Sequence, residues 1–151
     1  MKGRVLKLFI VSEEGIKPVH RVSFVKEHGI LGDKHVGDGS RHVSILSLSS
    51  LRYMQEKGYE VEAKDFHINM LVEGLDPRKI EMGDKLRFKE VLLEVTQLGS
   101  SIEKQPRCEV YKRYGECIMQ IEGIFAKVVE GGDVAVEDNI ERVERLSLIH
   151  I

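Results

Sequence analysis

The chain of 151 residues carries 23 Lys and Arg against 25 Asp and Glu, a net charge of −2, and 42% of its residues are hydrophobic. This size and apolar content predict one folded domain over residues 1–151, and the balanced charge gives no sign of a nucleic-acid or anionic-membrane partner. No apolar run approaches the roughly 20 residues that a membrane span needs, and two cysteines cannot build a disulfide framework, so we expect a cytoplasmic, reducing setting.

The first half of the chain predicts strands followed by a short helix. Val5–Val11 and Val19–Val25 are rich in Val, Leu, Ile and Phe, and His42–Ser47 alternates polar and apolar residues. Over residues 48–58 the apolar positions recur at helical spacing, with serines available to cap the start and a glycine at the end. This change of period predicts a helix directly after the third strand.

The second half is dominated by strand patterns. They lie at Asn69–Val72, Lys85–Phe88, Val91–Thr96, Ile124–Val129, Val134–Val136 and Ile140–Val143. The second and third of these are predicted to form a hairpin, because their apolar residues share one face. The fourth and fifth flank a Gly-Gly pair, which favours another hairpin turn.

Short strands at this spacing, with few helices, predict a mainly β fold: a closed or nearly closed β-barrel. The last residues, 144–151, form a tail that ends in LSLIHI, which is apolar for a free end. Such a tail adds an edge strand or packs on a neighbouring chain. The sequence leaves open whether the protein is a monomer or a homodimer.

The segment KQPRCEVYKRYGEC contains both cysteines. A helix that starts at Pro106 would place Cys108 in its first turn, where the helix dipole favours the thiolate, and Lys104 and Arg107 add positive charge nearby. A thiolate binds metal or attacks sulfur. The alternative is that Cys108 packs inward as a small apolar residue. The residues alone leave both interpretations open.

Cys117 lies among apolar residues in GECIM, and we expect it to be buried for structural reasons. No C-x-x-C motif supports a redox pair, and the histidines do not have zinc-finger spacing.

A second dense segment, HGILGDKHVGDGSRHVSIL, combines glycines, histidines and charges. Asp33 and His35 lie two apart, so on an extended segment the carboxylate could orient the imidazole. Arg41 could hold an anion, and Asn69, between two apolar residues, would have to form hydrogen bonds if buried. The alternatives are a long turn with solvated side chains, an ion pair that stabilises the turn, a surface arginine and backbone bonding by Asn69.

Taken in order, the segments GILGDKH, RHVSILS, FHINMLVEGL, MGDKLRF, LLEVTQ, PRC and EGIFAKVVEGGDVAVED resemble the MOSC domain, the C-terminal domain of molybdenum cofactor sulfurases that also occurs as small stand-alone proteins. The resemblance covers about Val5 to Val143. It implies a compact barrel in which Cys108 is a molybdenum ligand or the carrier of a persulfide sulfur. Where the family has Glu-Asn, this chain has Ile68-Asn69, so only Asn69 carries over.

The resemblance implies two functions. In the first, the domain holds molybdenum-molybdopterin and reduces N-hydroxylated compounds with electrons from an external donor. Cys108 would ligate the metal, Asp33, His35 and Asn69 would hold the pterin or substrate, and cations would neutralise the cofactor phosphate: Arg41, Lys104, Arg107 and Lys112 or Arg113. In the second, the domain carries sulfur from a donor protein as a persulfide on Cys108, or delivers cofactor, without turnover of its own.

A third interpretation is a barrel that has lost its chemistry and serves as an interaction module. No pyridoxal phosphate is expected on this chain, since it lacks the lysine-bearing aminotransferase-like domain of the large sulfurases. The cofactor itself is a small molecule, and the substrate and the electron donor are not specified by these residues.

Overall fold

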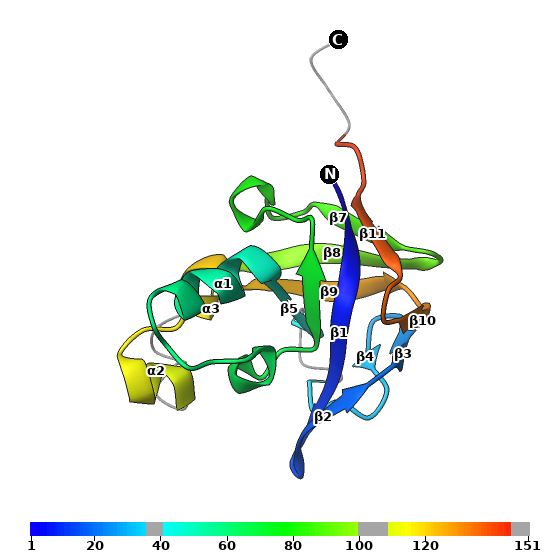
Figure 1. Ribbon diagram of the computed structural model, residues 1–151. Coiled ribbons are helices and arrows are strands. Elements are labelled where there is room, and N and C mark those ends of the chain that lie inside the picture. Colours follow the sequence, from blue (N-terminus) through cyan, green and yellow to red (C-terminus); the bar gives the residue numbers. More distant parts are fainter. Residues whose placement is uncertain (36–40, 100–108, 146–151) are drawn as a thin grey trace.

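The computed structural model describes residues 1–35, 41–99 and 109–145 (Figure 1). In chain order its elements are β1 (Lys2–Ser12), β2 (Gly15–Val19), β3 (Arg21–Val25), β4 (Gly29–Ile30), β5 (Val43–Ser47), α1 (Leu48–Glu56), η1 (Ala63–Phe66), β6 (Met70–Glu73), η2 (Pro77–Lys79), β7 (Lys85–Phe88), β8 (Val91–Leu98), α2 (Glu109–Tyr114), α3 (Met119–Glu122), β9 (Ile124–Glu130), β10 (Gly132–Ala135) and β11 (Asn139–Arg142).

The main sheet closes on itself. Its strand order is β11-β7-β8-β9-β5-β6-β1-β2, and a further pairing of β11 with β1 closes the strands from β11 to β1 into a barrel, with β2 paired to β1 beside it. The strands pair antiparallel except β5 and β6, which are parallel because α1 and η1 lie between them in the chain. The predicted mainly β fold with a closed barrel is confirmed, and the helices lie on one side of it (Figure 1).

A small second sheet corrects two of the sequence predictions. The predicted strand Val19–Val25 is interrupted at His20, because β2 pairs with β1 in the main sheet whereas β3 pairs with β10 and β4 in the second sheet. The predicted hairpin around Gly131-Gly132 is also wrong. Both strands exist, but β9 stays in the barrel and β10 crosses to β3. Local turn chemistry does not specify which sheet a strand joins, since that depends on long-range pairing.

Alternation along the strands separates two apolar clusters. Inward-facing residues such as Ile45, Met70 and Leu93 fill the barrel. Outward-facing residues such as Leu46, Leu71 and Phe125 pack against the helices. Because each strand presents its odd and even positions to opposite faces, the barrel wall has a core on both sides where helices cover it.

The N-cap residue Ser47 positions helix α1. The Ser47 hydroxyl accepts a hydrogen bond from the Ser49 backbone N–H, and it also donates to the Leu75 carbonyl at 3.1 Å. Leu51 and Met54 are buried against the barrel, as the spacing predicts. No helix among the described residues is long and apolar enough to cross a membrane.

Candidate functional site

A row of four residues crosses neighbouring strands on the outer face of the barrel. Phe125 of β9 pairs with Ser44 of β5. The Asn69 backbone N–H, just before β6, donates to the Ser44 carbonyl at 3.0 Å, and the Phe9 N–H of β1 donates to the Asn69 carbonyl at 2.8 Å. The register of four strands therefore sets the spacing of these side chains.

The side chain of Asn69 links neighbouring members of this row by hydrogen bonds. Its side chain is fully buried. Its Oδ1 accepts from the Ser44 backbone N–H at 3.0 Å, and its Nδ2 donates to the Phe9 carbonyl at 3.2 Å and to Asp33 Oδ1 at 2.8 Å. The prediction that a buried Asn69 would form hydrogen bonds is confirmed, and its partners are backbone groups and Asp33.

Asp33 lies beneath the row with its side chain 0% exposed. Its Oδ1 accepts from the Val11 N–H at 2.7 Å as well as from Asn69, and its Oδ2 accepts from the His35 N–H at 3.0 Å. His35 Nδ1 lies 2.8 Å from Oδ2. The carboxylate therefore contacts the imidazole as predicted, but on a turn and not on the extended segment from which the sequence argument started.

Burial by itself would raise the pKa of Asp33. The hydrogen bonds from the His35 ring, the Val11 N–H, the His35 N–H and Asn69 act in the opposite direction and together hold this pKa below its ordinary value. Asp33 is thus a buried anion whose charge is stabilised by surrounding donors. With Nδ1 of His35 facing Asp33, Nε2 is the ring nitrogen left for another partner.

Arg41 lies across Phe125, with its guanidinium carbon 4.1 Å from the ring centroid. Its Nε is buried and has no hydrogen-bond partner within the described part of the chain. His35, Arg41, Ser44 and Phe125 line a pocket of about 140 Å³. This pocket, which we call the Arg41 pocket, combines a cation held by an aromatic face with an imidazole and a hydroxyl, a set of groups suited to an anion.

Of the residues predicted for the site, the fold brings four together: Asp33 and Asn69 in one hydrogen-bond network, His35 bonded to that network and Arg41 across the pocket from it. The other three, Lys104, Arg107 and Cys108, lie outside the described residues. The described residues contain no group of three or more His, Cys, Asp or Glu side chains arranged to hold a metal ion. Cys117 is buried, which confirms its predicted structural place.

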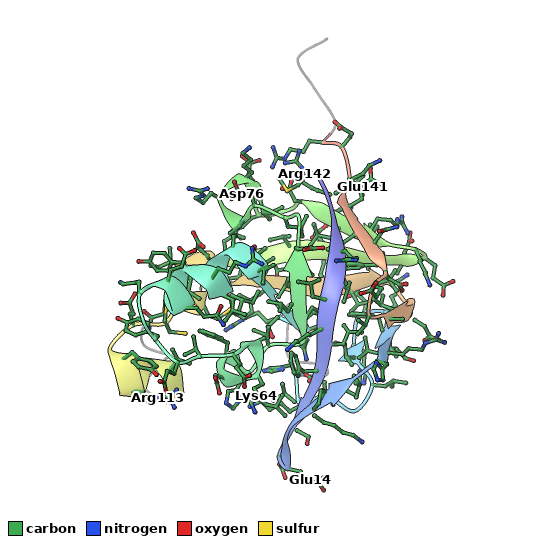
Figure 2. The ribbon with its side chains drawn as sticks, viewed as in Figure 1. Glu14, Lys64, Asp76, Arg113, Glu141 and Arg142 are labelled. Atoms are coloured by element: carbon green, nitrogen blue, oxygen red, sulfur yellow. The ribbon has the colours of Figure 1, made fainter. Side chains whose placement is uncertain are left out.

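The helix that follows Cys108 is held at its far end. Tyr114 of α2 stacks on Tyr59, with ring centroids 4.4 Å apart, and Glu116 accepts hydrogen bonds from the Tyr59 hydroxyl at 2.5 Å and from Lys57 Nζ at 2.8 Å. Arg113 donates to the Glu60 carbonyl at 2.9 Å, so the structure uses this arginine to bind α2 to the chain before η1. Figure 2 shows Arg113 projecting from α2.

Sequence reasoning missed two residues of the Arg41 pocket. Ser44 gave a usable signal, because a polar residue inside the apolar run HVSIL must find partners if the strand is buried. Phe125 gave none. An aromatic residue in a buried strand ordinarily indicates core, and only its pairing with Ser44 places it beneath Arg41.

Comparison with known proteins gives a family match and several matches of fold. The family model described as MOSC domain matches residues 32–141. The YuaD protein of Bacillus subtilis superposes with a TM-score of 0.75 at 19% identity, over 93% of this chain and 94% of that one. YiiM of Escherichia coli gives 0.67 at 21% identity, over 97% and 72% of the two chains. YiiM of Geobacillus stearothermophilus gives 0.59 at 16% identity, over 95% and 74%. Among proteins with curated descriptions, none matches this chain.

Proposed function

Since the chain belongs to the MOSC domain family, whose members are associated with the molybdenum cofactor, we propose that it binds this cofactor and reduces N-hydroxylated compounds. Cys108 is the proposed molybdenum ligand. A soft thiolate is a suitable partner for this metal. The proposal makes the chain an oxidoreductase that depends on an external electron donor.

The observation that carries the proposal is the buried Nε of Arg41. A buried donor without a partner is costly, so a group that accepts from it would be stabilised. Ser44 and His35 border the same pocket and offer further polar atoms. These groups would fit an anionic end of the cofactor such as its phosphate. A pocket of about 140 Å³ is too small for the pterin as well, which would have to lie outside it.

The residues of the site then have distinct tasks. Arg41 holds the anion, and Phe125 keeps the guanidinium in place. The Ser44 hydroxyl borders the pocket and donates to Asn69 Oδ1 at 3.3 Å. Asp33 orients His35, whose Nε2 can hold a proton at the pocket. When bound, the cofactor would supply the two electrons that, with two protons, convert an N-hydroxyl group into an N–H group and water. Asn69 keeps Asp33 in register with the strands.

The first experiment measures cofactor content. Wild type, Cys108→Ser and, as a matched control, Cys117→Ala are purified anaerobically from cells that make molybdopterin. Molybdenum is measured by mass spectrometry and pterin by fluorescence, both per chain. We expect near-stoichiometric molybdenum in wild type and in Cys117→Ala, and loss of the metal in Cys108→Ser.

A second pair of variants tests the anion site. Arg41→Met should lose pterin and molybdenum together, whereas Arg52→Met, at an exposed arginine of α1, should retain both. Cofactor-loaded protein is then assayed for reduction of hydroxylamine to ammonia with a chemical electron donor.

Absence of molybdenum and pterin from every preparation would contradict the cofactor-bound enzyme. A persulfide on Cys108, found by mass spectrometry of the intact chain, would then favour the sulfur carrier. If neither cofactor nor persulfide is found, the barrel is better described as an interaction module.

A further inference from the structure

A groove on the outside of the barrel has no described lining residue in common with the Arg41 pocket. It lies between β1, the end of β2 and η1, has a volume of about 390 Å³, and is lined mainly by Leu6, Lys7, Phe9, Val19, Ala63 and Val136. This volume falls within the range of small-molecule sites. We call it the η1 groove. Figure 2 marks Lys64, which lies on η1 at its edge.

An irregularity in β1 creates the groove. The register of β1 against β6 shifts between Val5 and Lys7. Val5 and Leu8 both lie in the barrel core, three positions apart, so the ordinary alternation is broken between them. Leu6 instead packs with the outer cluster, and Lys7 is exposed. A β-bulge thus places an apolar side chain and a cation next to each other on the outer surface.

A change of pairing partner leaves space beside this bulge. β1 pairs with β11 through residues 2–4 and with β2 through residues 8–12. The β1 edge between the two is bordered by Val19 at the end of β2 and by Val136, whose N–H donates to the His20 carbonyl at 2.9 Å. The apolar walls are partly exposed to solvent. A ligand with an apolar body would therefore bury apolar surface there, which favours binding.

The charged side chains at the edge of the groove indicate whether the ligand is an anion or a cation. Lys7 and His20 have no ion-pair partner among the residues described. Glu62 is the one acidic side chain among the described lining residues, and it lies 3.6 Å from Lys64 Nζ. Its backbone N–H is also bonded to Asp65 Oδ2, which fixes this residue in a capping box. Since Lys64 is paired with Glu62, Lys7 is the lining cation left without a described ion-pair partner, and it would attract an anion and repel a cation.

We propose that the η1 groove binds a small amphipathic anion, an aromatic or branched aliphatic body that carries one carboxylate or sulfonate. The body packs on Leu6, Val19 and Val136, and the anionic group lies beside Lys7. The site is independent of the molybdenum cofactor. A negative result for this site would therefore leave the proposed reduction unaffected, and the reverse also holds.

The test uses 8-anilinonaphthalene-1-sulfonate as the anionic probe and N-phenyl-1-naphthylamine, the same aromatic body without the sulfonate, as the neutral one. Fluorescence titration of folded wild-type protein should show one saturable site for the sulfonate and weaker binding of the neutral compound. Lys7→Glu should weaken sulfonate binding by about fivefold or more, since it reverses the charge at the proposed contact. Lys2→Glu, at an exposed lysine of the same strand outside the groove, should change it by less than about twofold.

A further variant examines the apolar wall. Leu6→Asn should weaken both probes, and cooperative thermal unfolding of each variant checks that it is folded. Absence of saturable sulfonate binding to wild type would overturn the proposal. So would equal effects of Lys7→Glu and Lys2→Glu, because the probe would then respond to overall charge, and so would equal affinity for the two probes.

Discussion

Asp33 and Asn69 are joined by a buried hydrogen bond of 2.8 Å between Oδ1 and Nδ2, although they lie 36 positions apart in the chain. Through this bond the loop that carries His35 is attached to the start of β6. The orientation of the imidazole at the Arg41 pocket thus depends on the barrel itself. Loss of either partner should affect both stability and the site.

Asn69→Ala removes the amide that donates to Asp33 Oδ1 and accepts from the Ser44 N–H. These two buried groups then lose this hydrogen-bond partner. We expect the free energy of unfolding in urea to fall by about 2–4 kcal/mol. Asn139→Ala, at an exposed position on β11, should change it by less than about 0.5 kcal/mol. Equal losses in the two variants would contradict the network.

Asp33 should also give the protein a pH-dependent stability. Its pKa is lower in the folded state than in the unfolded chain, because the donors around it outweigh the cost of burial. The stabilisation is therefore full above the unfolded-state pKa of about 4 and is lost as the pH falls through the folded-state value.

Asp33→Asn removes that ionisation, and its amide would place a donor against Asn69 or Val11. Urea unfolding between pH 6 and pH 2 should show a shallower acid loss in Asp33→Asn than in wild type. Asp133→Asn, an exposed control that keeps Asp33, should retain the wild-type slope. An unchanged slope in Asp33→Asn would show that other carboxylates account for the acid sensitivity.

Gly74 tests the close approach of β1 to the end of β6. Its φ is +86°, and a Cβ there would lie 2.4 Å from the Lys2 carbonyl oxygen. Gly58 has a similar φ of +91° with nothing within 4 Å of an added Cβ, so it isolates the cost of backbone conformation. We expect Gly58→Ala to cost about 1 kcal/mol, and Gly74→Ala about 2 kcal/mol more, in urea unfolding. Similar costs would mean that the strands adjust without strain.

Arg145, the last described residue of the chain, is bonded to the barrel through Asp84. Its Nε and one terminal nitrogen each lie 2.8 Å from an oxygen of Asp84, whose side chain is 4% exposed. The arginine's hydrogen bonds are the main reason that the pKa of Asp84 is lowered. Arg145→Ala should lower the free energy of unfolding at pH 7, because it removes the charged partner of the buried Asp84 carboxylate and leaves it the Glu81 N–H as a donor.

The matched control is Arg78→Ala, whose side chain is 80% exposed beside Asp76 and should cost less than about 0.5 kcal/mol. The difference between the two variants should shrink at pH 3, where Asp84 begins to protonate in the variant that lacks its partner. A difference that persists unchanged at low pH would assign the effect of Arg145 to packing.

The sequence by itself determined the local elements and one short-range relationship. Alternating residues specify strands such as Val43–Ser47, and the change of period at Leu48 specifies α1. Asp33 and His35, two residues apart, meet within a turn. These depend on neighbours in the chain, whose geometry is fixed by the backbone. The spacing of the short strands predicted the barrel, and the family resemblance agreed with it.

Only the tertiary structure decided which strands pair and which side chains meet across them. The break at His20, the pairing of β10 with β3 and the register that places Ser44 opposite Phe125 all join distant segments. Many other strand pairings satisfy the local sequence preferences equally well. The pairing that forms is the one that buries apolar side chains on both faces of the barrel wall. The Arg41 pocket is a product of that choice, because it forms where His35, Arg41 and Ser44 meet Phe125 of the distant strand β9.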